Sequence, residues 1–134
     1  MDARLRTQVR DRAGRRCEYC RIHEDDDPFF TFPIDHVIAQ QHGGATTLEN
    51  LCLSCFRCSA HKGPNLTSID PATGITTSLF HPRRDLWGEH FHWDWPVLVG
   101  NTPTGRATVR CLAINHSDAV MLRELLLTEG RFWG

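Results

Sequence analysis

Four of the six cysteines form two Cys-x-x-Cys pairs, Cys17 with Cys20 and Cys55 with Cys58. A tight turn places thiolates at positions i and i+3 on one side of the backbone, so two such turns together offer the four soft ligands of a closed tetrahedral zinc site. Disulfides are the weaker interpretation, because no signal peptide is recognisable and a reducing compartment is therefore expected. A thioredoxin-like redox motif would need only one pair. The spacing thus predicts structural Zn²⁺ on these four residues.

The other two cysteines, Cys52 and Cys111, lie in apolar stretches of the chain. Cys52 precedes Cys55 by three residues and could compete for the metal. Its two leucine neighbours favour a small buried residue in a strand. Cys111, within the run 108–114, is interpreted in the same way, as a buried residue of a strand.

A second group of residues, between and around the cysteine pairs, has the types that hydrolytic chemistry uses. Its elements are, in chain order, Ile34-Asp35-His36-Val37-Ile38, Gly43-Gly44, Asn50-Leu51 and Cys55-x-x-Cys58-Ser59-x-x-Lys62. In order and spacing they resemble the HNH endonuclease family, whose core is a β-hairpin and a helix around one catalytic metal ion, the ββα-metal fold. Further runs resemble a bacterial subgroup of HNH proteins of similar length: His61-Lys62-Gly63-Pro64-Asn65, Ile69-Asp70-Pro71-x-Thr73-Gly74, Leu79-Phe80-His81-Pro82-Arg83-x-Asp85 and Gly105-Arg106-Ala107-Thr108. The resemblance therefore covers nearly the whole chain.

The resemblance implies a role for each residue of the motif. His36 would be the general base, a task that suits an imidazole with an ordinary pKa of about 6.5. Asp35 would hold the catalytic divalent ion, Mg²⁺ or another, although in a regular strand it would face away from His36. Asn50 would orient the His36 ring. Ser59 departs from the family, which has Asn or His there as a metal ligand, and its short neutral hydroxyl is a weaker ligand.

The leading prediction is a metal-dependent endonuclease that hydrolyses phosphodiester bonds in double-stranded DNA in the bacterial cytoplasm. The alternative is a catalytically weakened or inactive zinc module that binds nucleic acid, with Ser59 as the mark of lost activity. A third hypothesis is a protein-interaction module that uses the aromatic segment 86–95, although alternating aromatic residues there favour the packing of a sheet. The candidate phosphate contacts are Arg57, Lys62, Arg83 and Arg84, with a solvated surface as the competing interpretation for the arginines.

Composition bounds these hypotheses. The chain has 134 residues, of which 40% are hydrophobic and 23% charged, which predicts one globular domain over residues 1–134. No apolar run is long enough to cross a bilayer. The net charge of −1 does not indicate nucleic-acid binding, but 14 of the 15 basic residues are arginine, and arginine forks onto phosphate. On charge alone, a solvated amphipathic helix beside an acidic loop is the favoured interpretation.

The secondary-structure elements that position these residues are predicted from the spacing of apolar residues and from the glycine, proline and capping residues at element ends. The predicted elements are a helix over 4–13, strands over 29–38 and 50–54, a helix over 56–62, turns at 70–74 and 102–105, and a helix from 117 to 130. The last helix is expected to be capped by Ser117 and to bury Val120, Met121, Leu122, Leu125 and Leu126. The predicted fold class is α+β, with a zinc-stapled ββα-metal core over 17–64, an N-terminal helix, and a strand and helix extension over 65–134.

Overall fold

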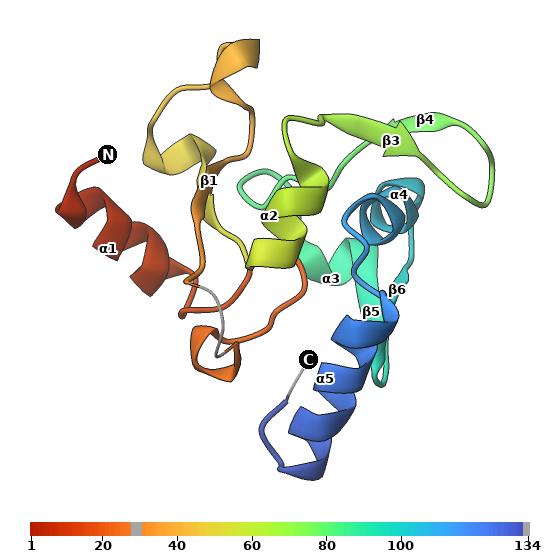
Figure 1. The fold of residues 1–134 in the computed structure, drawn as a ribbon. Coiled ribbons are helices and arrows are strands. Elements are labelled where there is room, and N and C mark those ends of the chain that lie inside the picture. The colour runs from red at the N-terminus through yellow and green to blue at the C-terminus, as the bar shows by residue number, and fades with distance from the viewer. Residues whose placement is uncertain (28–30, 133–134) are drawn as a thin grey trace.

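A computed structural model describes residues 1–27 and 31–132 of the chain. It confirms the α+β class, with helices and small antiparallel sheets (Figure 1). The predicted strand over 29–38 is shorter than expected: β1 spans Ile34–His36, and Phe29 and Phe30 lie outside the described residues. In the described part of the chain, no helix is long and apolar enough to span a membrane.

The central unit is a hairpin followed by a helix. β1 pairs antiparallel with β2 (Leu51–Leu53), so that Asp35 lies opposite Cys52. All three residues of β2 are fully buried, which confirms the expectation that Cys52 is a buried strand residue. α2 (Phe56–Lys62) follows at once, with Cys55 as its N-cap, and ends at Gly63, which has a φ of 50°. The order β1, β2, α2 is the ββα arrangement that the sequence predicts.

The N-terminal helix braces this unit. α1 (Ala3–Arg12) begins at the cap residue Asp2, and its Val9 is fully buried. The guanidinium of Arg12 donates to the carbonyl oxygens of Leu48 at 2.7 Å and Leu51 at 2.6 Å. These bonds tie α1 to the end of the loop that connects β1 with β2. This loop contains two short 3₁₀ helices, η2 (Gln40–His42) and η3 (Leu48–Asn50), and another, η1 (Glu24–Asp26), precedes β1.

The C-terminal extension consists of hairpins and helices. β3 (Thr67–Ile69) pairs with β4 (Thr76–Ser78), and this hairpin projects from the body of the molecule (Figure 1). α3 (Trp87–His90) leads into β5 (Phe91–Asp94), which pairs with β6 (Val97–Gly100). α4 (Pro103–Cys111) and α5 (Ser117–Thr128) complete the chain.

The predicted turn at 102–105 and the interpretation of 108–114 as a strand are wrong, because both segments contribute to α4. The Thr102 side chain accepts a hydrogen bond from the Gly105 N–H and so caps the helix, with Pro103 at its first turn. Gly105 also lies against the end of α3, since an added Cβ would sit 2.1 Å from the His90 carbonyl oxygen. Cys111 is therefore a half-buried helix residue and not a strand residue.

The expectation for the last helix is partly wrong. Its N-cap is His116, whose side chain accepts from the Asp118 N–H, and not Ser117. Leu126 is buried as predicted, but Met121 and Leu125 are exposed. Arg123 is buried in their stead, because its guanidinium donates to backbone carbonyls of the neighbouring segments.

The extension meets the core at the first cysteine turn. The Trp87 indole N–H donates to the Tyr19 carbonyl oxygen at 2.8 Å, and the Tyr19 ring packs edge-on against Phe80. Arg83 forms an ion pair with Glu18, whose other carboxylate oxygen accepts from the Leu53 N–H. Buried apolar side chains of the two parts form one continuous cluster.

Candidate metal centre and catalytic pocket

The four cysteines of the two pairs converge in space. Their Sγ atoms all lie within 4.8 Å of one another, and all four residues are buried. The sulfurs of Cys20 and Cys55 are 3.7 Å apart. Tetrahedral zinc with bonds of about 2.3 Å requires sulfurs about 3.8 Å apart, so the cluster has the dimensions of such a site. The cysteines are positioned to bind a metal ion.

Both cysteine turns are built to hold thiolates. The Cys20 N–H points at the Cys17 sulfur at 3.5 Å, and the Cys58 N–H points at the Cys55 sulfur at 3.4 Å. Burial opposes ionisation of Cys17, but hydrogen bonds from the other three thiols outweigh it and hold the pKa of Cys17 well below its usual value. Cys55 and Cys58 donate their protons in hydrogen bonds to Cys17 and Cys20, and these bonds raise the pKa values of both donors. A metal cation that replaced those protons would allow all four sulfurs to carry charge.

A pocket of about 250 Å³ opens between the β1 end and α2. It is lined by Asp35, His36, Ala39, Gln40, Ser59, Lys62, Gly63 and Pro64. Asp35 and His36 both line it, although strict strand alternation would separate them. β1 ends at His36, so the backbone is free to leave the regular strand geometry there. The carboxylate, the imidazole and the Ser59 hydroxyl thus share one pocket.

The electrostatics of the pocket centre on Asp35. Burial raises the pKa of its carboxyl group, while a hydrogen bond from Ser59 and the charge of Lys62 act in the opposite direction. Lys62 is only 4% exposed, and its ammonium donates to the Val37 carbonyl oxygen at 2.9 Å. Burial lowers the pKa of Lys62, and the neighbouring acidic groups oppose that shift. The pocket therefore brings a half-buried carboxyl group and a buried ammonium group within electrostatic reach of each other.

Asn50 and His36 are placed by the same loop. The Asn50 side chain accepts from the Ile38 N–H and donates to the carbonyl oxygens of Ile38 and Ala45, each at 2.9 Å. The His36 Nε2 atom lies 2.8 Å from the Thr46 hydroxyl oxygen. Asn50 thus holds the loop closed, and its ring-orienting role stays a prediction. Sequence reasoning misses Thr46, because one of two adjacent threonines in a loop carries no distinguishing pattern.

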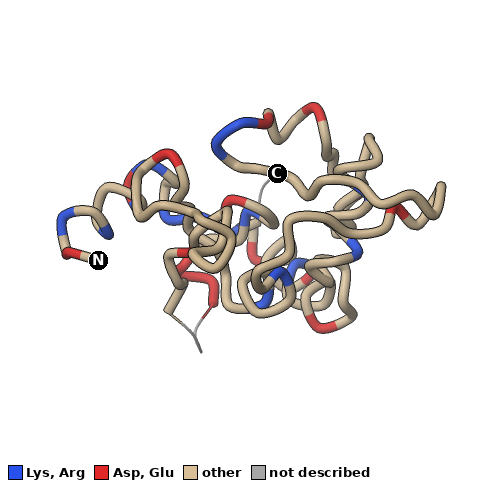
Figure 2. The backbone as a smooth tube through the Cα atoms, turned by 90° about the horizontal axis from the view of Figure 1, so that it is seen from above, with Lys and Arg blue, Asp and Glu red and all other residues tan. Residues whose placement is uncertain are grey.

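The four candidate phosphate contacts do not lie together. Lys62 lies in the pocket, whereas Arg57 lines a larger, mainly apolar cavity of about 470 Å³ on a different face of α2. Arg83 is engaged with Glu18, and Arg84 is exposed. Figure 2 shows basic and acidic segments interspersed along the backbone. Of the four, only Lys62 lines the pocket with His36.

Comparison with known proteins agrees with this geometry. The model of the HNH endonuclease family matches residues 17–65. No curated protein and no solved structure matches the chain. The matched segment contains the four-cysteine cluster, both strands of the central hairpin, α2 and the pocket of Asp35 and His36. Residues 17–65 of the chain are therefore similar to the HNH endonuclease family.

Proposed function

We propose that this protein is a metal-dependent endonuclease that hydrolyses phosphodiester bonds in double-stranded DNA. The observation that supports this most directly is the shared pocket of Asp35, His36 and Lys62 within the HNH segment. Phosphodiester hydrolysis needs an activated water, neutralisation of phosphate charge and stabilisation of the leaving oxygen. The pocket offers a base, a metal-binding carboxylate and a cation for these three tasks.

Each residue has a distinct task in this proposal. The His36 imidazole takes a proton from the attacking water, an effect typically worth about 10²- to 10⁴-fold. Asp35 would hold a divalent ion such as Mg²⁺, with Ser59 as a weak or water-bridged neighbour, and that ion supplies charge neutralisation at the phosphate. The Lys62 ammonium lies close enough to Asp35 to affect its ionisation and can contribute positive charge to a bound phosphate. Asn50 keeps the loop behind His36 closed.

Zinc is proposed for the four-cysteine cluster, in a structural role. Four buried thiolates with no carboxylate or open position form a closed site, which suits Zn²⁺ and leaves no place for substrate. The cluster joins the first cysteine turn to the start of α2. It therefore fixes the helix that carries Ser59 and Lys62 relative to the rest of the core.

A binding module without turnover is the second candidate, and one observation favours it. The Ser59 hydroxyl forms a hydrogen bond with the Asp35 carboxyl group, and a neutral hydroxyl is itself a weak ligand for a divalent ion. A divalent ion would then have one protein carboxylate as its main ligand. This alternative predicts DNA binding that weakens steeply with salt and is not followed by cleavage.

Plasmid nicking with Mg²⁺ or Mn²⁺ separates the two candidates. The proteins compared are the native chain, His36→Ala, Ser59→Asn, Ser59→Asn with His36→Ala, and the control Ser78→Asn at an exposed position of β4. Cleavage by the native chain, lost on His36→Ala, supports the enzyme proposal as stated. Cleavage by Ser59→Asn but not by the native chain, again lost with His36→Ala, shows that the native site lacks one metal ligand. Cleavage by none of them, with salt-sensitive retention of DNA in gels, overturns the enzyme proposal and supports the binding module.

A further inference from the structure

We propose that Thr46 positions the His36 ring and fixes its tautomer, with the proton on Nε2 and the lone pair on Nδ1. The observation that supports this proposal is the distance of 2.8 Å between His36 Nε2 and the Thr46 Oγ1 atom. The hydrogen bond rests on this distance, whereas the choice of tautomer and its catalytic consequence rest on the proposed function. Thr46 is outside the motif by which the sequence resembles its family.

The loop that carries Thr46 is held in place from both sides. Asn50 clasps Ile38 and Ala45, so the residue directly before Thr46 is tied to the exit of β1. Gly44 packs against the same exit, since an added Cβ would lie 1.7 Å from the Ile38 carbonyl oxygen. The Gly44 N–H also donates to the Ala39 carbonyl oxygen at 3.1 Å. These contacts present the Thr46 hydroxyl to the ring from a fixed backbone, although the side chain is exposed.

The tautomer follows from what each ring nitrogen must do. A neutral imidazole carries one N–H and one lone pair. If Thr46 Oγ1 accepts the Nε2–H, the Nδ1 lone pair is available to a water molecule in the pocket. If the hydroxyl donated to Nε2, the proton would sit on Nδ1 and that nitrogen could not act as a base. The proposed arrangement is therefore the one that allows general-base catalysis.

The same bond assists the proton transfer. The base step moves one proton from water to Nδ1 and leaves a hydroxide whose oxygen bonds to phosphorus. The bond from phosphorus to the leaving sugar oxygen breaks, and that oxygen takes a proton from solvent water. Both ring nitrogens then carry N–H groups and the ring is cationic. The Nε2–H bond to Thr46 becomes charge-assisted and therefore stronger. Thr46 acts through His36, and its hydroxyl also lies 3.5 Å from the Gln40 side-chain nitrogen, so it is a positioning residue.

The test uses the full metal-loaded chain labelled with ¹⁵N in histidine, at a pH where the ring is neutral. Long-range ¹H–¹⁵N spectra assign the proton to one ring nitrogen, and solvent exchange of that proton reports the hydrogen bond. We expect a slowly exchanging Nε2 proton in the native chain and in Thr46→Ser, and its loss to fast exchange in Thr46→Val. The control Thr47→Val should match the native chain. A proton on Nδ1 in the native chain, or an Nε2 proton that exchanges equally slowly in Thr46→Val, overturns the inference.

Cleavage kinetics supply the second arm, in whichever of the native or Ser59→Asn chains cuts DNA. A poorly oriented base should lower kcat about 10- to 100-fold in Thr46→Val with little change in KM, and Thr46→Ser should restore most of it. An unchanged kcat in Thr46→Val overturns the catalytic part. If neither background cuts, the nuclease proposal fails, while the spectra still decide whether Thr46 holds the ring.

Discussion

Asn50 shows how one buried side chain can hold the loop that borders a pocket. It is 9% exposed, and its amide satisfies one N–H and two carbonyl groups of the loop that follows β1. The family resemblance predicts a residue here that orients His36. In the described part of the chain, the structure shows Asn50 acting on the loop and Thr46 acting on the ring. Asn50 thus holds the loop in place, and the loop places the Thr46 hydroxyl beside the His36 ring.

Removing the Asn50 amide should destabilise the protein. Asn50→Ala leaves backbone groups of Ile38 and Ala45, whose bonds to Asn50 are partly buried, without their partner, and an unsatisfied group costs about 1–3 kcal/mol when it is buried. We expect a loss of about 2–3 kcal/mol in the free energy of unfolding, measured by urea denaturation of the metal-loaded chain. The control is Asn65→Ala at an exposed position, which should change stability by less than about 0.5 kcal/mol. Equal losses in both variants would contradict this account of Asn50.

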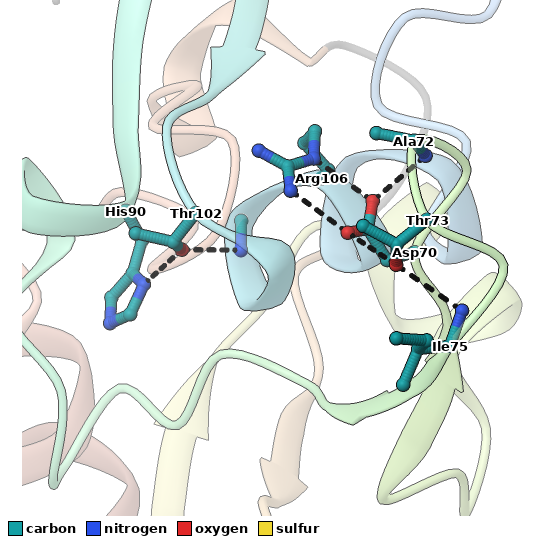
Figure 3. A network of polar contacts seen from close by, with 8 residues as sticks. Asp70, Ala72, Thr73, Ile75, His90, Thr102 and Arg106 are labelled. Atoms are coloured by element: carbon teal, nitrogen blue, oxygen red, sulfur yellow. Dashed lines mark hydrogen bonds and ion pairs between the residues drawn. The ribbon is translucent and has the colours of Figure 1, made fainter.

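At the scale of elements, one ion pair joins the β3–β4 hairpin to α4. Arg106 on α4 donates through Nε and Nη2 to the two carboxylate oxygens of Asp70, at 2.9 and 2.8 Å (Figure 3). Asp70 also accepts from the Ala72 N–H and the Thr73 hydroxyl, so it organises the turn of its own hairpin. The Arg106 hydrogen bonds hold the pKa of Asp70 well below its usual value. The carboxylate is thus an anchor between two elements.

A double-mutant cycle measures this anchor. Asp70→Ala and Arg106→Ala should each lower the urea midpoint, because each leaves the partner charge without its bidentate contact. The double variant should lose less than the sum of the single losses, since the two side chains act as one unit. Arg110→Ala, at an exposed position of the same helix, is the control and should have little effect. Strictly additive losses would show that the pair is not coupled.

At the scale of the molecule, the metal centre and the extension meet at the first cysteine turn. Trp87 and Arg83 from the extension bind Tyr19 and Glu18, which lie between Cys17 and Cys20. The Arg21 guanidinium also lies over the Trp87 ring, 4.9 Å from its centre. We propose that residues 1–134 fold as one domain, because the turn that holds the metal also supports the extension.

Removal of the metal should therefore unfold more than the core. Structural zinc contributes about 10–16 kcal/mol of apparent binding free energy, as much as the stability of a whole domain. Chelation with EDTA or the substitution Cys58→Ser should abolish near-UV circular dichroism from the region 17–63 and from the tryptophans of the extension together. Cys111→Ser, outside the cluster, should retain both. Full retention of the near-UV signal in EDTA would contradict a structural metal.

Features that depend on a few neighbouring residues follow from the amino-acid sequence by itself. The Cys-x-x-Cys pairs, the Asp35-His36 pair and α2 with its Gly63 stop all follow from short-range geometry, and the four thiols lie together as predicted. Local spacing suffices here because a turn or a helix places side chains three or four residues apart on one side. The four clustered cysteines and the pocket residues therefore all lie within the segment 17–64.

Long-range contacts decided the rest. The run 108–114 has β-branched residues, yet most of it belongs to α4, because the close approach of Gly105 to His90 and the Arg106 anchor to Asp70 favour a helix. Arg123 is buried in α5 because carbonyl groups of Pro96 and Ile114 receive its guanidinium. Thr46 reaches His36 only after the loop closes on Asn50. In each case the partner is remote in sequence, so no local pattern specifies the contact, and packing of the whole chain selects it.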